Sequence, residues 1–242
     1  ARRGVAPGHE AARLAAFVSS EIKTHGLGPR DFAILVRQKA AGYAAGLEPA
    51  FEAAKIPLRN EDGAVGAMKL QELLTEEASQ LAIQLLRLSM TKRAGRHWSA
   101  SQNALAALHG ISIEDEAGHA RLARDLDTFT LAIAAAHPAP PASPSESLTI
   151  TKKLIDFIGR DRLVAVHPAY AQGGWLAKVI EAIASHLTAS AKNEAGWSEA
   201  LDVYEGIDAV PLMTIHKSKG LEYHSVMFVG LDDGAWWSFA GD

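Results

Sequence analysis

The sequence predicts an α/β protein in which two distant parts of the chain build one parallel sheet, with a block of helices inserted between them. Short apolar runs, typical of strands buried on both faces, occur near both ends of the 242 residues, at 31–37 and within 210–230. The region between them has helical periodicity over most of its length. Neither flank has enough strands for its own sheet, so the two flanks are expected to share one.

The first flank reads as helix, strand, helix. Apolar side chains recur at helical spacing over 10–24, and Gly26, Gly28 and Pro29 end that helix. The apolar run at 31–37 is the predicted strand, and a second helix is predicted at about 43–54, ended by Ile56-Pro57-Leu58.

The middle of the chain is predicted to be helical, with a proline-rich connector at 137–144 that cannot be helical. The predicted helices are 69–90, 99–108, 114–136, 149–158, 173–189 and 196–205. Strands return at 210–215 and 224–230. The expected organisation is therefore a first sheet segment at 1–58, a helical insertion at 59–207 and a second sheet segment at 208–242.

The composition excludes several kinds of functional site. The chain has no cysteine, which excludes disulfides, thiolate metal sites and cysteine nucleophiles, and its histidines are isolated, so no metal site is expected. The net charge is −4, so any nucleic acid must bind a local patch. No apolar run is long enough to cross a membrane and no signal peptide is recognisable, so no membrane partner and a cytoplasmic protein are expected. Ala1 and Asp242 suggest a piece of a longer protein.

The segment most informative about chemistry is Thr214-Ile215-His216-Lys217-Ser218-Lys219-Gly220-Leu221-Glu222-Tyr223. It places hydroxyl, imidazole, ammonium and backbone N–H groups after an apolar strand. Open α/β sheets bind ligands at that edge, and such groups suit phosphate oxygens. Glu222 is an acceptor suited to a sugar hydroxyl. We expect the Lys217–Gly220 turn to lead into a short turn of helix and then the next strand.

This segment closely resembles motif V of the UvrD/Rep/PcrA-like superfamily 1 DNA helicases. The strand at 31–37, with Leu47-Glu48, Phe51 and Ile56-Pro57, resembles the family's motif IV and the helix that follows it. The long helical insertion is similar to the 2B subdomain, which in this family interrupts the second RecA-like motor domain, 2A. The resemblance therefore implies a split RecA-like domain 2A with a mainly helical 2B-like insertion.

The resemblance also implies roles for individual residues. Arg37 would reach the γ-phosphate of ATP, while Gly220 and Glu222 would contact the nucleotide, Glu222 at the ribose. Thr214 and His216, with Lys219 close by, would contact the backbone of single-stranded DNA. ATP would bind with Mg²⁺, whose ligands belong to the first RecA-like domain, 1A. The sequence contains no GxxxxGK(S/T), so the chain alone is not expected to hydrolyse ATP or unwind DNA.

The sequence departs from the family pattern at two places and resembles it misleadingly at a third. Val36 stands where well-known members carry an aromatic residue that stacks on adenine. Asp232-Asp233-Gly234-Ala235-Trp236-Trp237 replaces an acidic–Gly–x–Phe–Pro segment. Asp115-Glu116-Ala117-Gly118-His119 superficially resembles a DExx box, but it begins a polar helix and is discounted.

Three functional interpretations remain open. The first is part of an ATP-dependent 3′–5′ DNA helicase or translocase, with roles in DNA repair or recombination undecided. The second is part of a helicase–nuclease subunit of the AddA or RecB kind. The third is a non-catalytic module that binds a protein or duplex DNA through 59–207.

Basic clusters are the feature of the insertion that favours duplex contact. They are Lys92-Arg93 with Arg96-His97-Trp98, and Lys152-Lys153 with Arg160 and Arg162. Acidic residues outnumber basic ones in the insertion, which favours a solvated face instead. Trp175 and Trp197 are predicted to belong to the core.

Overall fold

A computed structural model describes residues 7–91 and 95–231 and divides the chain into two compact units. The sheet unit comprises 1–64, 69–71 and 206–242, and the helical unit comprises 65–68 and 72–205. The boundary expected after Leu58 falls inside a strand, because residues 58–60 pair with the sheet. The sheet unit therefore extends six residues further than the sequence predicted, to Ala64.

The sheet unit contains a four-stranded parallel sheet in the order β2-β5-β1-β6. Its strands are β1 (Phe32–Val36), β2 (Leu58–Asn60), β5 (Val210–Thr214) and β6 (Ser225–Phe228). β1 pairs with β5 on one side and with β6 on the other, although about 175 residues separate them in the chain. The prediction that the two flanks share one parallel sheet is confirmed.

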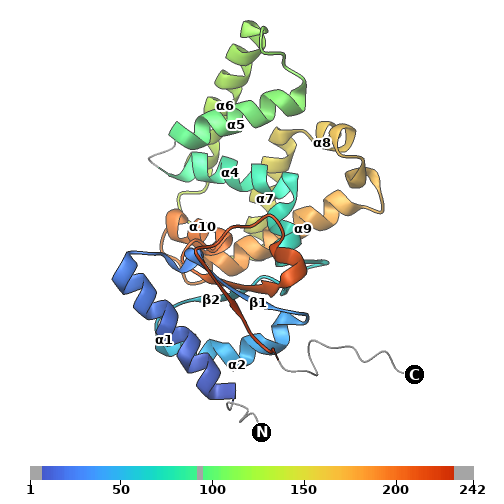
Figure 1. The fold of residues 1–242 in the computed structure, drawn as a ribbon. Helices are drawn as coiled ribbons and strands as arrows, with labels where there is room; N and C mark the ends of the chain where they lie inside the picture. Colours follow the sequence, from blue (N-terminus) through green and yellow to red (C-terminus); the bar gives the residue numbers. More distant parts are fainter. Residues whose placement is uncertain (1–6, 92–94, 232–242) are drawn as a thin grey trace, which may run out of the picture. The chain divides into compact units, whose positions relative to one another are not determined.

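The two faces of this sheet are covered differently. Along β1, alternate side chains from Phe32 to Val36 enter a core formed with α1 (Pro7–His25) and α2 (Ala40–Ala53). Figure 1 shows both helices on the same side of the strands. The 3₁₀ turn η1 (Pro29–Asp31) leads into β1. On the opposite face, Ala33 and Leu35 contact Met213, and only a small apolar cluster forms.

The helical unit is built around one apolar core to which most of its helices contribute. Its helices are α4 (Glu77–Met90), α5 (Gly95–His109), α6 (Glu116–Ala136), α7 (Pro144–Ile158), α8 (Arg160–Val166), η2 (Pro168–Ala171), α9 (Trp175–Ala191) and α10 (Trp197–Glu205). The short helix α3 (Leu70–Thr75) and the two-residue strands β3 (Ala64–Val65) and β4 (Met68–Lys69) lie where the chain passes between units.

The single helix predicted at 69–90 is wrong, because the chain is broken at Glu76. This residue has extended backbone angles, φ −68° and ψ 129°, and precedes the first turn of α4. Its carboxylate accepts hydrogen bonds from Tyr170 Oη at 2.8 Å and Trp175 Nε1 at 3.2 Å. Tyr170 Oη also accepts from the Ala78 N–H, a free donor of the new helix end. Contacts nearly 100 residues away therefore set the break, and periodicity could not reveal them.

The two tryptophans, the proline-rich connector and the start of α6 follow the sequence predictions. Trp197 is 6% exposed, which confirms it as core, and Trp175 is partly buried against the same core. The connector has no helix until Pro144, where Ser143 caps α7. Asp115 caps α6 by accepting from the Gly118 N–H at 2.8 Å, which confirms the reading of that segment as a helix start. Within the described ranges, no helix combines the length and apolarity needed to cross a bilayer.

Candidate nucleotide and nucleic-acid site

The carboxyl edge of the sheet brings the two resembling motifs together. Val36 and Thr214 are Cα partners in neighbouring parallel strands, and they are the last residues of β1 and β5. Arg37 directly follows the first strand, and His216 lies two residues beyond the second. Because parallel strands end at the same edge, these groups from residues 37 and 214–216 share one corner of the sheet unit.

The segment after β5, residues 215–220, forms two consecutive tight turns and is called the motif loop below. Ile215–Ser218 is a 3₁₀ turn in which Ser218 Oγ donates to the Ile215 carbonyl at 2.9 Å. A type II β-turn follows, with Lys219 at φ −59° and ψ 127°, Gly220 at φ +79°, and the Leu221 N–H donating to the Ser218 carbonyl at 3.1 Å. The helical turn expected after residue 220 therefore lies before it, within the motif itself, which corrects the sequence prediction.

Glycine has a specific reason to stand at 220. The second central position of a type II turn requires a positive φ, which a side chain with a Cβ adopts at a cost. No atom lies within 4 Å of the place that a Cβ would take at Gly220. Backbone geometry, not crowding, is therefore the reason for glycine.

A buried glutamine donates a hydrogen bond to the backbone of the motif loop. Gln71, in α3, is 9% exposed, and its Nε2 donates to the Lys217 carbonyl at 2.6 Å. The same nitrogen lies 3.9 Å from Met213 Sδ. The Gln71 backbone N–H donates to the Glu61 carbonyl at 3.0 Å. Sequence reasoning missed this residue, because it lies within the expected helix 69–90 and 146 positions from its partner.

A second polar cluster lies beneath the segment that leads from the motif loop to β6. Glu61 is 2% exposed, and its Oε1 lies 2.9 Å from Arg30 Nη1 and 2.6 Å from Arg59 Nη2. Burial raises the pKa of Tyr223, and the Glu61 carboxylate adds to the rise while the two arginines oppose it. Burial lowers the pKa of Arg59, against the effect of Glu61. Charged residues flanking Leu58–Asn60 were the only signal for this cluster.

The predicted contact residues differ in exposure. His216, Lys219, Gly220 and Glu222 are exposed, whereas Arg37 and Thr214 are partly exposed. The motif loop thus offers an imidazole, an ammonium group and backbone N–H groups at the surface of the sheet unit. Such groups, together with the Arg37 guanidinium, are donors for phosphate oxygens.

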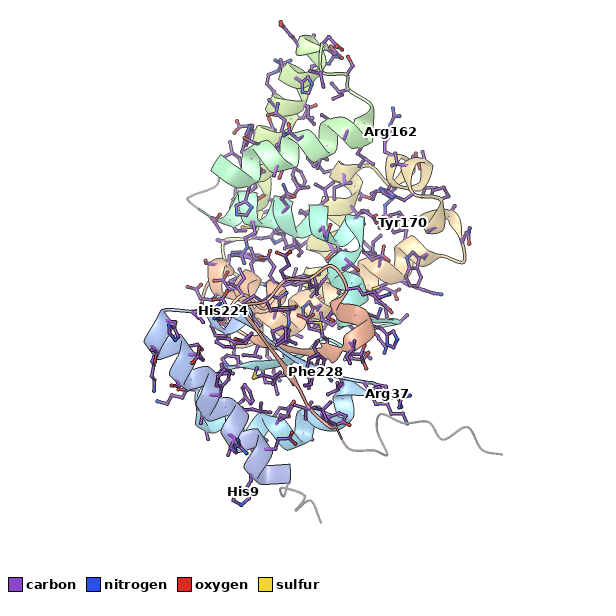
Figure 2. All side chains as sticks on the ribbon, viewed as in Figure 1. His9, Arg37, Arg162, Tyr170, His224 and Phe228 are labelled. Atoms are coloured by element: carbon purple, nitrogen blue, oxygen red, sulfur yellow. The ribbon has the colours of Figure 1, made fainter. Side chains whose placement is uncertain are left out.

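Glu222 is placed differently from the other predicted residues. It lies on the unpaired segment 221–224, which leads to Ser225, and Ser225 is the partner of Phe32 at the start of β1. Arg37 follows the other end of that strand. Figure 2 shows Arg37 and His224 at opposite ends of the strands. The register therefore brings Arg37 and Thr214 together and leaves Glu222 on the segment that returns toward the amino edge.

Val36 is fully buried in the core shared with α1 and α2. A side chain in that position is directed away from solvent and cannot stack on a nucleotide base. Valine at this position, where the family pattern has an aromatic residue, therefore serves the core of the sheet unit.

The described basic side chains of the predicted clusters lie at the surface of the helical unit. Lys152 and Lys153 are exposed on α7, and Arg160 Nε pairs with Asp156 at 2.6 Å on consecutive helices. Arg162 is exposed on α8. The cluster around 92–96 and the segment 232–237 fall outside the residues or side chains that are described. Across the described part of the chain, no three acidic or histidine side chains gather as ligands for a metal ion.

Comparison with known proteins supports the resemblance to helicases. No curated protein matches the sequence. A family model described as the UvrD-like helicase C-terminal domain matches residues 144–240, a range that begins at α7 and includes β5, the motif loop and β6. The match confirms the resemblance found in the sequence. Residues 144–240 of this chain are therefore similar to the UvrD-like helicase C-terminal domain.

Proposed function

We propose that this chain is part of an ATP-dependent 3′–5′ DNA helicase or translocase, and that the carboxyl edge of its sheet contacts both ligands. The observation that carries the proposal is the pairing of Val36 with Thr214, which puts Arg37 and the motif loop at one edge. The family match supports the helicase class. The polarity and the individual contacts are inferred from the resemblance.

In this proposal Arg37 donates to the γ-phosphate of ATP, where a guanidinium stabilises the charge that develops during phosphoryl transfer. Gly220 lets the backbone approach the nucleotide. Glu222 accepts from the ribose, which places the ribose beyond the carboxyl edge, along the segment that leads to Ser225. Mg²⁺ neutralises phosphate charge when ATP is bound. Its ligands and the P-loop are expected from RecA-like domain 1A, because no such motif occurs in this sequence.

Thr214, His216 and Lys219 are proposed to contact phosphates of single-stranded DNA. They lie on the strand end and on the motif loop, and the latter two are exposed. Since the net charge is −4, this local group must supply the attraction, so binding should be weak and sensitive to salt.

The test is a fluorescence-anisotropy titration of the chain with labelled single-stranded and duplex DNA at low and moderate salt. The Thr214→Ala/His216→Ala variant is expected to lose about tenfold in single-strand affinity and to show a shallower salt dependence. His224→Ala is the matched control, since it removes an exposed histidine at the other end of the strands. Equal binding by wild type and the double variant would contradict the DNA contacts. Duplex binding that the double variant retains would favour the interaction-module alternative through 59–207.

The ATP contact is tested in a protein that also carries the P-loop domain. Arg37→Ala should lower kcat for ATP hydrolysis by about 10³-fold or more, with DNA affinity changed less than about twofold. Arg37→Lys keeps the charge but loses the planar fork, and is expected to recover little. Equal losses of hydrolysis and DNA affinity would contradict this role. The same full-length sequence would show whether a nuclease domain follows, as the AddA or RecB alternative requires.

A further inference from the structure

We infer that Gln71 is a positioning residue that sets the conformation of the motif loop for DNA binding, an inference that rests on the proposed function. In the described part of the sheet unit, Glu61 and Gln71 are the two polar side chains that are buried. A buried amide must be hydrogen-bonded to offset its lost hydration, so its partner is informative.

The partner of the Gln71 amide is the middle of the motif. Lys217, whose carbonyl accepts at 2.6 Å, lies between His216 and the Lys219–Gly220 turn. A carbonyl fixed at 217 fixes the plane of the 217–218 peptide, which is the last peptide of the 3₁₀ turn and directly precedes the type II turn. This bond therefore helps to set the directions of the exposed side chains on either side, together with the hydrogen bonds within the two turns.

Gln71 is itself held by the sheet. Its backbone N–H donates to the Glu61 carbonyl, and the Glu61 N–H donates to the Leu212 carbonyl in β5, both at 3.0 Å. The Glu61 carboxylate is fixed by Arg59 and Arg30. A rigid donor is thus anchored to the strand from which the motif loop emerges, which is the arrangement a positioning group needs.

Gln71 lies at the boundary between the two units in the chain. Lys69–Gln71 is the last piece of the sheet unit before the chain enters the helical unit at Glu72. The residue that bonds to the motif loop is therefore directly followed in the chain by the first residue of the helical unit, Glu72.

The experiment compares Gln71→Met with Gln80→Met in the 242-residue chain. Both changes remove a glutamine amide that donates to a backbone carbonyl, but Gln80 is exposed on α4 and bonds to Leu74 at 3.2 Å. Backbone hydrogen exchange at 216–221 should be about threefold to tenfold faster in Gln71→Met and unchanged in Gln80→Met. Exchange in β1 should not change. Gln71→Asn, which keeps the amide but is one methylene shorter, should behave like Gln71→Met.

Single-strand affinity provides the functional readout. Gln71→Met should weaken it about threefold to tenfold, and should have no further effect in the Thr214→Ala/His216→Ala background. Unchanged exchange at 216–221, or equal acceleration throughout the sheet unit, would overturn the positioning role. Faster loop exchange with DNA affinity unchanged in every variant would instead reject the proposed DNA contacts and leave the structural effect of Gln71 established.

Discussion

The two units use their polar side chains in opposite ways. In the helical unit, Arg87 is 7% exposed, its Nη2 lies 2.6 Å from Asp202 Oδ1, and its Nε donates to Glu205 at 2.6 Å. In the sheet unit, His216 and Lys219 are exposed on a loop whose backbone is held from beneath by Gln71. Polar groups in the first case join helices α4 and α10, and in the second they are presented to solvent. Buried polar contacts support structure in both units, and in the sheet unit they also hold the backbone that carries the exposed His216 and Lys219.

The largest effect is expected from breaking the helical unit's ion pairs. Arg87→Ala should lower the free energy of unfolding by about 2 kcal/mol, because the buried aliphatic stem leaves a gap and two partly exposed acidic side chains lose their common partner. Urea denaturation measures this effect. Single-strand DNA affinity of the folded protein should stay within about twofold of wild type. If Arg87→Ala weakened DNA binding strongly and left stability unchanged, the structural role of Arg87 in the helical unit would be contradicted.

A smaller effect is expected at the glycine of the motif loop. Gly220→Ala should destabilise by about 1 kcal/mol, because it forces a Cβ into positive φ, and should weaken DNA binding as well. Gly46→Ala is the matched control. Gly46 is exposed inside α2, nothing lies within 4 Å of its Cβ position, and alanine should stabilise there by about 0.5–1 kcal/mol. Equal signs at the two positions, measured by thermal and urea denaturation, would contradict the turn assignment.

The smallest effect is a pH dependence of the helical unit. Burial lowers the pKa of His137, the nearby Lys153 adds to this, and Glu146 opposes it. The folded state therefore binds this proton less readily than the unfolded state, so stability is lost as pH falls below the ordinary histidine pKa of about 6.5. Its Nε2 is buried without a hydrogen-bond partner, which disfavours the protonated ring further.

His137→Gln should reduce the slope of stability against pH between about 7 and 5, measured as the urea midpoint at each pH. His9→Gln, an exposed change on α1, is the control and should leave the slope unchanged. A His137→Gln profile that coincides with wild type would show that this histidine has no part in the pH dependence.

Sequence reasoning predicted the shared parallel sheet because β1 and β5 are continuous apolar runs that are followed by polar or charged residues. It missed β2, since three residues after Ile56-Pro57 carry no periodicity and owe their conformation to pairing with Val210–Leu212. It also missed α8 and joined α3 to α4, because the break at Glu76 depends on Tyr170 and Trp175. Local patterns identified elements that local interactions define.

The same limit applies to the candidate site. Thr214, His216 and Lys219 were recognisable because they are contiguous with a family motif, and the placement of Arg37 beside them follows from adjacent parallel strands. Gln71 and Glu61 had no such signal, because their partners at Lys217 and Leu212 are roughly 150 positions away. The sequence therefore indicated the surface groups of the candidate site, whereas the buried residues beneath them had no local signal.

Single-stranded DNA is proposed to bind the carboxyl edge of the sheet unit. The most direct test is backbone hydrogen exchange of the chain with and without an oligo-dT strand at low salt. We expect slower exchange over 214–220, with α4 and α9 unchanged. Protection confined to the helical unit, for example around Lys152 and Lys153 on α7, with none at 214–220, would contradict the account.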